Sequence, residues 1–230
     1  MSAKKVIEIA RGELGSTESP PGSNRTKYGE AFGWDGVPWC VIFLWWCFRE
    51  AGESAAFFGG GKTASCGTLL RWYQAQGQRI DMQKAEAGDV LPGDIVILDF
   101  TGKGETQHCG IVEAAFTSSG KLATVRTIEG NTTPGSEGSQ YNGGCVAEKW
   151  REPRQIFAVC RPTYKEEEKP VNDWEKHWAR QHIQWAVDEG IAQGYQDGSF
   201  QPDKPVTRAE LVTMLHRYDA LRSRRDADQE

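Results

Sequence analysis

The feature that most constrains the fold is an apolar run inside residues 36–52, "GVPWCVIFLWWCFREAG". From Cys40 to Phe48 every side chain is apolar or a thiol, so a helix formed here has no polar face to turn toward water. The run is too short to span a bilayer, and the sequence holds no apolar run of about 18 residues or more. We therefore predict a buried core helix over 39–51 that ends before Gly52.

A charged segment divides the chain of 230 residues into two parts. Residues 163–173, "TYKEEEKPVND", carry a proline and offer almost nothing apolar to bury, which is typical of a linker. We predict a first domain over 1–162, a linker over 163–171 and a second domain over 172–220. The remaining residues, 221–230, are polar and are expected to form a frayed tail.

In the first domain, helical patterns come early and strand patterns late. Ser2 is expected to cap a helix with apolar positions every four residues, and Ser65 a helix over 65–76. The apolar positions of the first helix are Val6, Ala10 and Leu14. Strand-like runs follow at 94–99, 109–116, 121–129, 145–150 and 155–161. Helices followed by an antiparallel meander predict an α+β domain, with the acidic stretch 82–90 as a solvated turn.

Charge and cysteine content narrow the possible functions. The net charge is −5 with no large basic block, which argues against nucleic acid as a partner. The six cysteines include no CxxC pair, so we expect free buried thiols and neither a disulfide framework nor a structural zinc site. The opening "MSAKKVIEIARGELG" has charges within its apolar periodicity, so we expect no secretory signal.

The two cysteines of the apolar run differ in their expected chemistry. Cys40 begins the predicted helix, where the helix dipole and unpaired N–H groups favour the nucleophilic thiolate. Cys47 lies about two turns further on, between Trp46 and Phe48, and is expected to be part of the core. Position alone leaves Cys40 as either a nucleophile or a small buried hydrophobe, because a nucleophile also needs a base.

A candidate base is His108 in "ETQHCGIVEA", the only histidine of the first domain. A histidine before a strand can be structural, but this one leads a strand expected to run beside "DIVILDF". A Cys–His pair needs a third group that orients the imidazole. Glu129, in "TIEGNTTPG", can hold the far ring nitrogen, and Asn131 can assist that orientation or donate to an oxyanion. The alternative is that "EGNTTPG" is only a turn.

These residues, in this order, resemble the CHAP family of cysteine- and histidine-dependent amidohydrolases and peptidases. The resemblance rests on "KYGEAFGWDGVPWCVIFLWWCFREAG", "LPGDIVILDF", "QHCGIVE" and "TIEGNT", and it covers roughly residues 1–162. It implies a papain-like fold and cleavage of amide bonds in bacterial peptidoglycan. It also implies that Cys40 is the nucleophile, His108 the base, Glu129 its orienting partner and Asn131 a further polar member of the site.

Residues just before the nucleophile bear on substrate and metal binding. Trp39 and Trp34 are candidates for lining the substrate groove, with simple packing as the alternative for Trp34. Some relatives carry an aspartate-rich calcium loop here, whereas "YGEAFGWDGVPW" holds the single aspartate Asp35. Calcium takes about six to eight oxygen ligands, so we expect no metal, and we expect no cofactor.

The second domain shows two helical patterns on either side of a glycine-rich loop. The apolar face of the first is marked by Ala179, Ile183, Ala186 and Ile191. The second opens with a capping box formed by Thr207 and, three residues later, Glu210. About 50 residues bury little core by themselves, so this domain is expected to leave apolar surface uncovered.

The stretch "HWARQHIQWAVDEGIAQGYQDGSFQPDKPVTRAELVTMLHR" resembles an S-layer homology repeat. Such repeats bind secondary cell-wall polysaccharide, which implies Arg208, with Trp178 as a weaker candidate, as binding residues. Trp174, Trp178 and Trp185 fall near one helix face and could stack on sugar or be buried. The family presents these repeats in threes and one is present, so we expect a homotrimer formed through 172–220.

The two resemblances together predict a peptidoglycan hydrolase, an endolysin of a phage or prophage, made in the host cytoplasm and acting at the cell wall. The cleaved bond could be that of an N-acetylmuramoyl-L-alanine amidase or of an endopeptidase. One alternative is an inactive wall-binding or structural protein, against which the intact Cys40, His108 and Glu129 argue. The other is a papain-like protease with a non-wall substrate, against which the polysaccharide anchor argues.

Overall fold

The computed structural model describes residues 2–80, 82–135, 137–165, 173–195 and 198–227. The chain divides into two compact units, Met1–Glu166 and Glu167–Glu230. Of the expected linker 163–171, all but 163–165 lies outside the described residues. Within the described ranges, no helix is both long and apolar enough to cross a bilayer.

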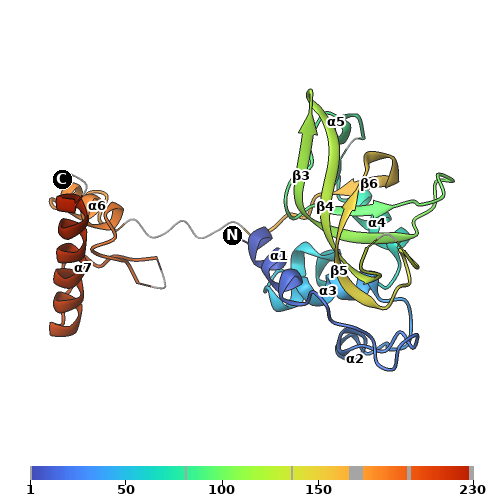
Figure 1. The fold of residues 1–230 in the computed structure, drawn as a ribbon, viewed down its shortest axis with the longest axis horizontal. Coiled ribbons are helices and arrows are strands. Elements are labelled where there is room, and N and C mark those ends of the chain that lie inside the picture. Colours follow the sequence, from blue (N-terminus) through green and yellow to red (C-terminus); the bar gives the residue numbers. More distant parts are fainter. Residues whose placement is uncertain (1, 81, 136, 166–172, 196–197, 228–230) are drawn as a thin grey trace. The chain divides into compact units, whose positions relative to one another are not determined.

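A six-stranded antiparallel sheet forms the centre of the first unit (Figure 1). Its strands are β1 (Arg79–Ile80), β2 (Ile95–Leu98), β3 (His108–Ser118), β4 (Lys121–Thr132), β5 (Cys145–Arg151) and β6 (Ile156–Cys160). The order is β1-β6-β2-β3-β4-β5, so β2 to β5 form the expected meander and β6 returns to pair with β2. Together with the helices, this sheet confirms the α+β class.

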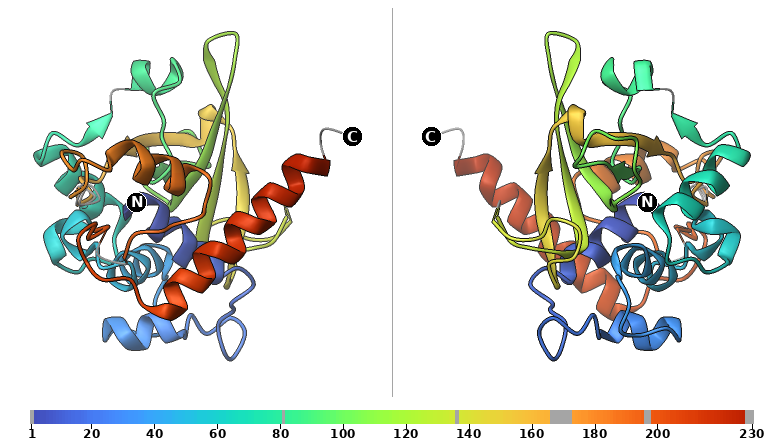
Figure 2. Two further views of the ribbon diagram at one scale, coloured as in Figure 1. Left: turned by 90° about the vertical axis from the view of Figure 1, so that its left-hand side faces the viewer. Right: turned by 90° about the vertical axis from the view of Figure 1, so that its right-hand side faces the viewer.

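Helices cover the sheet. They are α1 (Ser2–Gly12), α2 (Lys27–Phe32), α3 (Cys40–Glu50), α4 (Cys66–Ala75) and α5 (Met82–Glu86), with the 3₁₀ turns η1 (Ser54–Ala56), η2 (Phe58–Gly60) and η3 (Pro153–Gln155). The helix α3 is the predicted core helix, since it contacts β3 and β4 as well as α1 and α2. In Figure 2 the helices drawn in blue and cyan gather on one side of the curved sheet.

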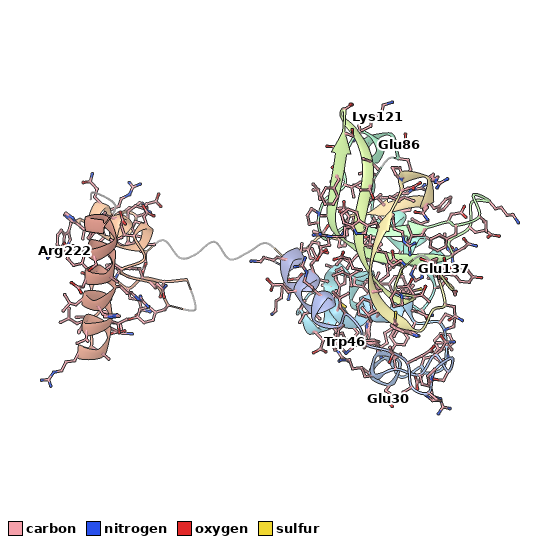
Figure 3. All side chains as sticks on the ribbon, in the orientation of Figure 1. Glu30, Trp46, Glu86, Lys121, Glu137 and Arg222 are labelled. Atoms are coloured by element: carbon pink, nitrogen blue, oxygen red, sulfur yellow. The ribbon has the colours of Figure 1, made fainter. Side chains whose placement is uncertain are left out.

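The strand β2 shows why the sheet needs cover on both faces. Ile95 and Ile97 are fully buried in the core that contains α3, whereas Val96 and Leu98 are fully buried in a second cluster on the other face. This alternation follows from the two-residue period of a strand. Ala85 of α5 belongs to the second cluster, so α5 closes part of that face. The tip of the β3–β4 hairpin, at Lys121, projects beyond this body (Figure 3).

Several local predictions need correction. The helix α1 buries Val6 and Ala10 but ends at Gly12, which leaves Leu14 40% exposed, and Ser2 is its first residue and not a residue before it. The stretch 82–90 is not a solvated turn, because α5 forms there with Ala85 buried. The cap at Ser65 is confirmed, since its side chain accepts a hydrogen bond from the N–H of Thr68 at 3.3 Å.

The second unit contains α6 (Arg180–Asp188) and α7 (Arg208–Ala227). The capping box is confirmed: Thr207 accepts from the N–H of Glu210 at 3.2 Å, and Glu210 accepts from the N–H of Thr207 at 2.8 Å. Residues 221–227 are not a frayed tail, because they continue α7. The three tryptophans do not share a helix face, since Trp174 and Trp178 precede α6 and only Trp185 lies within it.

Candidate active site

Cys40 is the first residue of α3. It is 5% exposed and belongs to the core cluster that contains α3. At the start of a helix, unpaired backbone N–H groups and the positive end of the helix dipole lie close to the side chain. Cys47 of the same helix is fully buried, and burial raises the pKa of its thiol well above the ordinary value. All six cysteines are free thiols, as predicted.

His108 and Glu129 meet inside the sheet. His108 opens β3 and Glu129 lies on the neighbouring strand β4, and both side chains are fully buried. The Nε2 atom of His108 lies 3.1 Å from Oε2 of Glu129, although neither ring nitrogen has a well-aligned hydrogen bond. Because Nε2 faces the carboxylate, Nδ1 is the ring nitrogen left for Cys40. Catalytic hydrogen bonds are often poorly aligned before substrate is bound.

Arg151, which the sequence did not indicate, contacts the carboxylate of Glu129 with two nitrogen atoms. Its Nε donates to Oε1 of Glu129 at 2.8 Å, and its Nη2 to Oε2 at 2.5 Å. Thr127 donates its hydroxyl to the same Oε1 at 2.6 Å. Arg151 is the last residue of β5 and is 3% exposed. A buried carboxylate is usually paired with a cation, so an arginine or lysine near Glu129 could have been expected from the sequence. The sequence alone does not identify which arginine or lysine it is.

The electrostatics of the site favour a thiolate–imidazolium pair. Contacts with the thiols of Cys109 and Cys66, and with His108, lower the pKa of Cys40 well below its ordinary value, although burial opposes the shift. Burial would lower the pKa of His108, but its contacts with Cys40 and Glu129 raise it to about 9. Burial would raise the pKa of Glu129, but hydrogen bonds from Arg151 and His108 lower it to about 2.

Two glycines allow the close packing that brings these side chains together. A Cβ atom on Gly110 of β3 would lie 2.6 Å from Cγ of Glu129. A Cβ atom on Gly130 of β4 would lie 2.5 Å from Cβ of Phe43 on α3. The first glycine makes room for the carboxylate beside His108. The second lets β4 approach the helix that carries Cys40.

Asn131 does not take part in the same ion-pair network. Its Nδ2 donates to Oδ1 of Asn142 at 3.0 Å, and its Oδ1 accepts from the N–H of Gly144 at 3.4 Å. The side chain is fully buried, and its φ of 59° lies in the left-handed region, which asparagine tolerates better than most residues. The structure thus places Asn131 as the anchor of the loop that follows β4.

The residues before the nucleophile divide into core and surface. Trp39 is fully buried, 5.5 Å from Tyr28 between ring centroids, so the prediction that it lines a substrate groove is wrong. Trp34 is 57% exposed and stays available for that role. Asp35 accepts a hydrogen bond from the N–H of Thr26 at 3.0 Å and thereby connects the loop to the start of α2.

In the second unit, both predicted polysaccharide-binding residues are accessible. Trp178 is 86% exposed, and Arg208 is exposed on the first turn of α7. A separate hollow of about 670 Å³ lies between α6 and α7. Its lining includes Ile183, Tyr195 and Arg217, but neither of the predicted residues.

Comparison with known protein families now adds to this geometry. Residues 32–131 match the CHAP domain, a range that holds Cys40, His108, Glu129 and Asn131. Residues 172–212 match the S-layer homology domain. The chain therefore carries a CHAP domain followed by an S-layer homology domain. This order is the one that the sequence analysis predicted.

Two relatives from Acetivibrio thermocellus match the second domain. A cellulosome-anchoring protein is 39% identical over 44 residues, which is 19% of this chain and 10% of that protein. Cell surface glycoprotein 1 is 46% identical over 39 residues, which is 17% of this chain and 2% of that protein. The chain thus spans only a small part of either relative.

Among solved structures, the wild-type endolysin LysIME-EF1 aligns with a TM-score of 0.46 and 16% sequence identity. The alignment covers 71% of this chain and 65% of the endolysin chain.

Proposed function

We propose that the chain is a peptidoglycan hydrolase that cleaves an amide bond with Cys40 as its nucleophile and is held at the cell wall by the S-layer homology domain. The observation that carries the proposal is the placement of Cys40 at the start of α3, where its pKa is lowered in part by His108, whose Nε2 lies 3.1 Å from Oε2 of Glu129. The CHAP domain match supports hydrolysis of the wall, and the second domain supports anchoring to it.

The proposed reaction has two stages. The thiolate of Cys40 attacks the amide carbonyl, and backbone N–H groups at the start of α3 stabilise the oxyanion. Protonated His108 gives its proton to the leaving amine, and the bond between carbonyl carbon and nitrogen breaks to leave a thioester on Cys40. Water then attacks the thioester with neutral His108 as the base, which releases the acid and restores the thiolate–imidazolium pair. Glu129 stabilises the imidazolium throughout.

A digestion of purified Gram-positive cell walls tests this function. Mass spectrometry of the released fragments identifies the cleaved bond and separates an N-acetylmuramoyl-L-alanine amidase from an endopeptidase. We expect release by the wild type and none by Cys40→Ala, whereas Cys47→Ala, which removes a buried thiol from the same helix, should retain activity. Equal release by wild type and Cys40→Ala would overturn the assignment of the nucleophile.

If the wild type, Cys40→Ala and Cys47→Ala all release no fragments but still bind the wall, the result would favour the alternative of an inactive wall-binding protein. The endolysin role, with synthesis in a host cytoplasm and action at the wall, belongs to the same proposal and depends on the hydrolysis.

For wall anchoring, we propose Arg208 and Trp178 as polysaccharide-binding residues. Both are exposed, and a cation and an aromatic ring are groups that can bind an anionic sugar chain. We expect Arg208→Ala and Trp178→Ala to reduce binding to wall polysaccharide freed of peptide. Arg180→Ala and Trp150→Ala, which remove exposed side chains of the same types elsewhere, are the matched controls. Unchanged binding by both test variants would place the ligand elsewhere.

A further inference from the structure

Three thiols meet behind the nucleophile. The Sγ atoms of Cys40, Cys66 and Cys109 all lie within 4.8 Å of one another, and the Cys40–Cys66 distance is 3.8 Å. The three residues come from different elements: the start of α3, the start of α4 and the strand β3. All three are at least nine-tenths buried, with exposures of 5%, 6% and 0%. The proposed hydrolysis uses only the first of them.

We propose that Cys40, Cys66 and Cys109 form a binding site for Zn²⁺ or a similarly thiophilic divalent ion, and that the bound ion makes the nucleophile unavailable. Zinc binds thiolate sulfur at about 2.3 Å in tetrahedral sites, which sets neighbouring sulfurs about 3.8 Å apart. The Cys40–Cys66 distance of 3.8 Å matches this spacing. A disulfide, in contrast, requires a sulfur–sulfur distance of about 2.05 Å.

Two of the three sulfurs lie at helix starts, although burial and the neighbouring Cys40 hold the pKa values of the Cys66 and Cys109 thiols well above the ordinary value, so these two thiols lose their protons only as the ion binds. Cys40 and Cys66 are each the first residue of a helix, with 11 residues in α3 and 10 in α4, so the positive ends of two helix dipoles converge on the cluster. Among the residues that the structure describes, no carboxylate joins this group, and thiolate ligands of this kind select soft ions over calcium or magnesium. The three thiols leave the fourth position of a tetrahedral ion open to a water molecule.

Binding would silence the site by a direct chemical route. Each coordinating thiol gives up its proton to solvent, and the sulfur lone pair of Cys40 that would attack the amide is then donated to the ion. Removal of the ion by a chelator restores the free thiolate. The inhibitory consequence rests on the proposed hydrolase function, but metal binding itself does not.

The absence of a CxxC pair from the sequence led to the expectation of no structural zinc site. Cys40 and Cys66 are 26 residues apart and come together only because the starts of two helices meet. Cys109 joins them because alternate residues of β3 face the helices: its side chain lies in the core cluster that contains α3. The expectation of no metal therefore addressed local motifs and not a site assembled from three elements.

Cobalt titration of the full, reduced chain tests the site by a readout other than activity. Co²⁺ bound by thiolates gives a sulfur-to-metal charge-transfer band and intense tetrahedral visible bands. We expect saturation at one equivalent, displacement by Zn²⁺, and an affinity more than about tenfold weaker in Cys66→Ser and Cys109→Ser. Cys47→Ala and Cys160→Ala remove buried thiols outside the cluster and should bind as the wild type does.

Absence of the charge-transfer band in the wild type would overturn the site. The same band at the same affinity in Cys66→Ser and Cys109→Ser would overturn it too. Cys109 is fully buried, so Cys109→Ser could fail to fold. In that case the cobalt affinity of Cys66→Ser, which changes the first residue of α4, decides whether the site exists. If the wild type hydrolyses walls, zinc sensitivity is measured as the ratio to each variant's own metal-free rate. If it does not, the cobalt spectra still decide.

Discussion

At the scale of single residues, the site is a row of alternating charges. In the proposed resting state, the Cys40 thiolate is followed by the His108 imidazolium, the Glu129 carboxylate and the Arg151 guanidinium, and these four groups have no net charge. A single ion buried to this degree would be costly, but each of these ions has a partner of opposite charge. Arg151 therefore allows Glu129 to stay ionised, and Glu129 in turn stabilises the imidazolium.

The first prediction concerns pH. The proposed mechanism requires a thiolate on Cys40, whose pKa is lowered, and a proton on His108, whose pKa is raised to about 9. We expect kcat/KM to be flat across neutral pH and to fall as pH rises through about 9. Because the pKa of His108 is raised from its ordinary value of 6.5, protonated His108 also stabilises the fold. This stabilisation is complete below pH 6.5 and is lost as the pH rises from there through about 9. Activity that rises through pH 9 would contradict the protonated state of His108.

The second prediction concerns Arg151 as a positioning residue. Arg151→Met removes one partner of a buried ion pair, and breaking such a pair costs about 3–5 kcal/mol in the free energy of unfolding. The pH profile should also shift, because Glu129 loses the group that keeps its pKa low. Arg151→Lys keeps the charge but not the two parallel hydrogen bonds. Its free energy of unfolding and its pH profile should therefore lie between those of Arg151→Met and the wild type.

The control for this variant is Arg154→Met, since Arg154 forms an ion pair with Glu152 but is 81% exposed. It should change neither stability nor the pH profile appreciably. A normal pH profile in Arg151→Met, with only its stability reduced, would show that Arg151 supports the fold and does not tune the site.

At the scale of elements, the site depends on how closely β3, β4 and α3 pack. The third prediction is that Gly110→Ala abolishes the proposed wall release, whereas its effect on the free energy of unfolding is smaller. The added methyl would lie 2.6 Å from Cγ of Glu129, so the carboxylate must shift away from His108. Gly12→Ala, where nothing lies within 4 Å, is the control and should have no effect on wall release. Full activity in Gly110→Ala would contradict the requirement for close His108–Glu129 contact.

Local patterns predicted those elements whose signals are strong. The apolar run predicted α3, and Ser65 and the Thr207–Glu210 box predicted the starts of α4 and α7. The sequence also proposed Cys40, His108 and Glu129 as nucleophile, base and orienting group, and the structure places Nε2 of His108 3.1 Å from Oε2 of Glu129. The sequence did not indicate Arg151, since the partner of Glu129 lies 22 residues away on another strand.

Side-chain direction was the main source of error. Trp39 precedes the nucleophile and was expected in the groove, but it points into the core, where it lies 6.5 Å from Phe43 between ring centroids. Neither composition nor spacing encodes that direction. A second error came from composition. The polar residues of 221–227 suggested a frayed tail, but they form the last part of α7.

At the scale of the whole molecule, the fourth prediction concerns oligomerisation. We propose a homotrimer formed through the second unit, supported by apolar side chains of α7 that stay uncovered. Their exposures are 47% for Leu211, 64% for Val212, 57% for Leu215 and 46% for Tyr218. Sedimentation or mass photometry should show a trimer at micromolar concentration, and Leu215→Glu should weaken it. A wild-type monomer across that range would refute the proposal.

The most direct test of the central claim, that Cys40 is a thiolate nucleophile, is its rate of alkylation by iodoacetamide as a function of pH. Peptide mapping by mass spectrometry identifies the modified thiol, and wall release is measured on the same samples. We predict that Cys40 reacts first among the six cysteines, at pH values well below its ordinary thiol pKa of 9.0, and that activity falls in step with modification. Alkylation of Cys40 only near that ordinary value, or full wall release by protein modified at Cys40, would contradict the account.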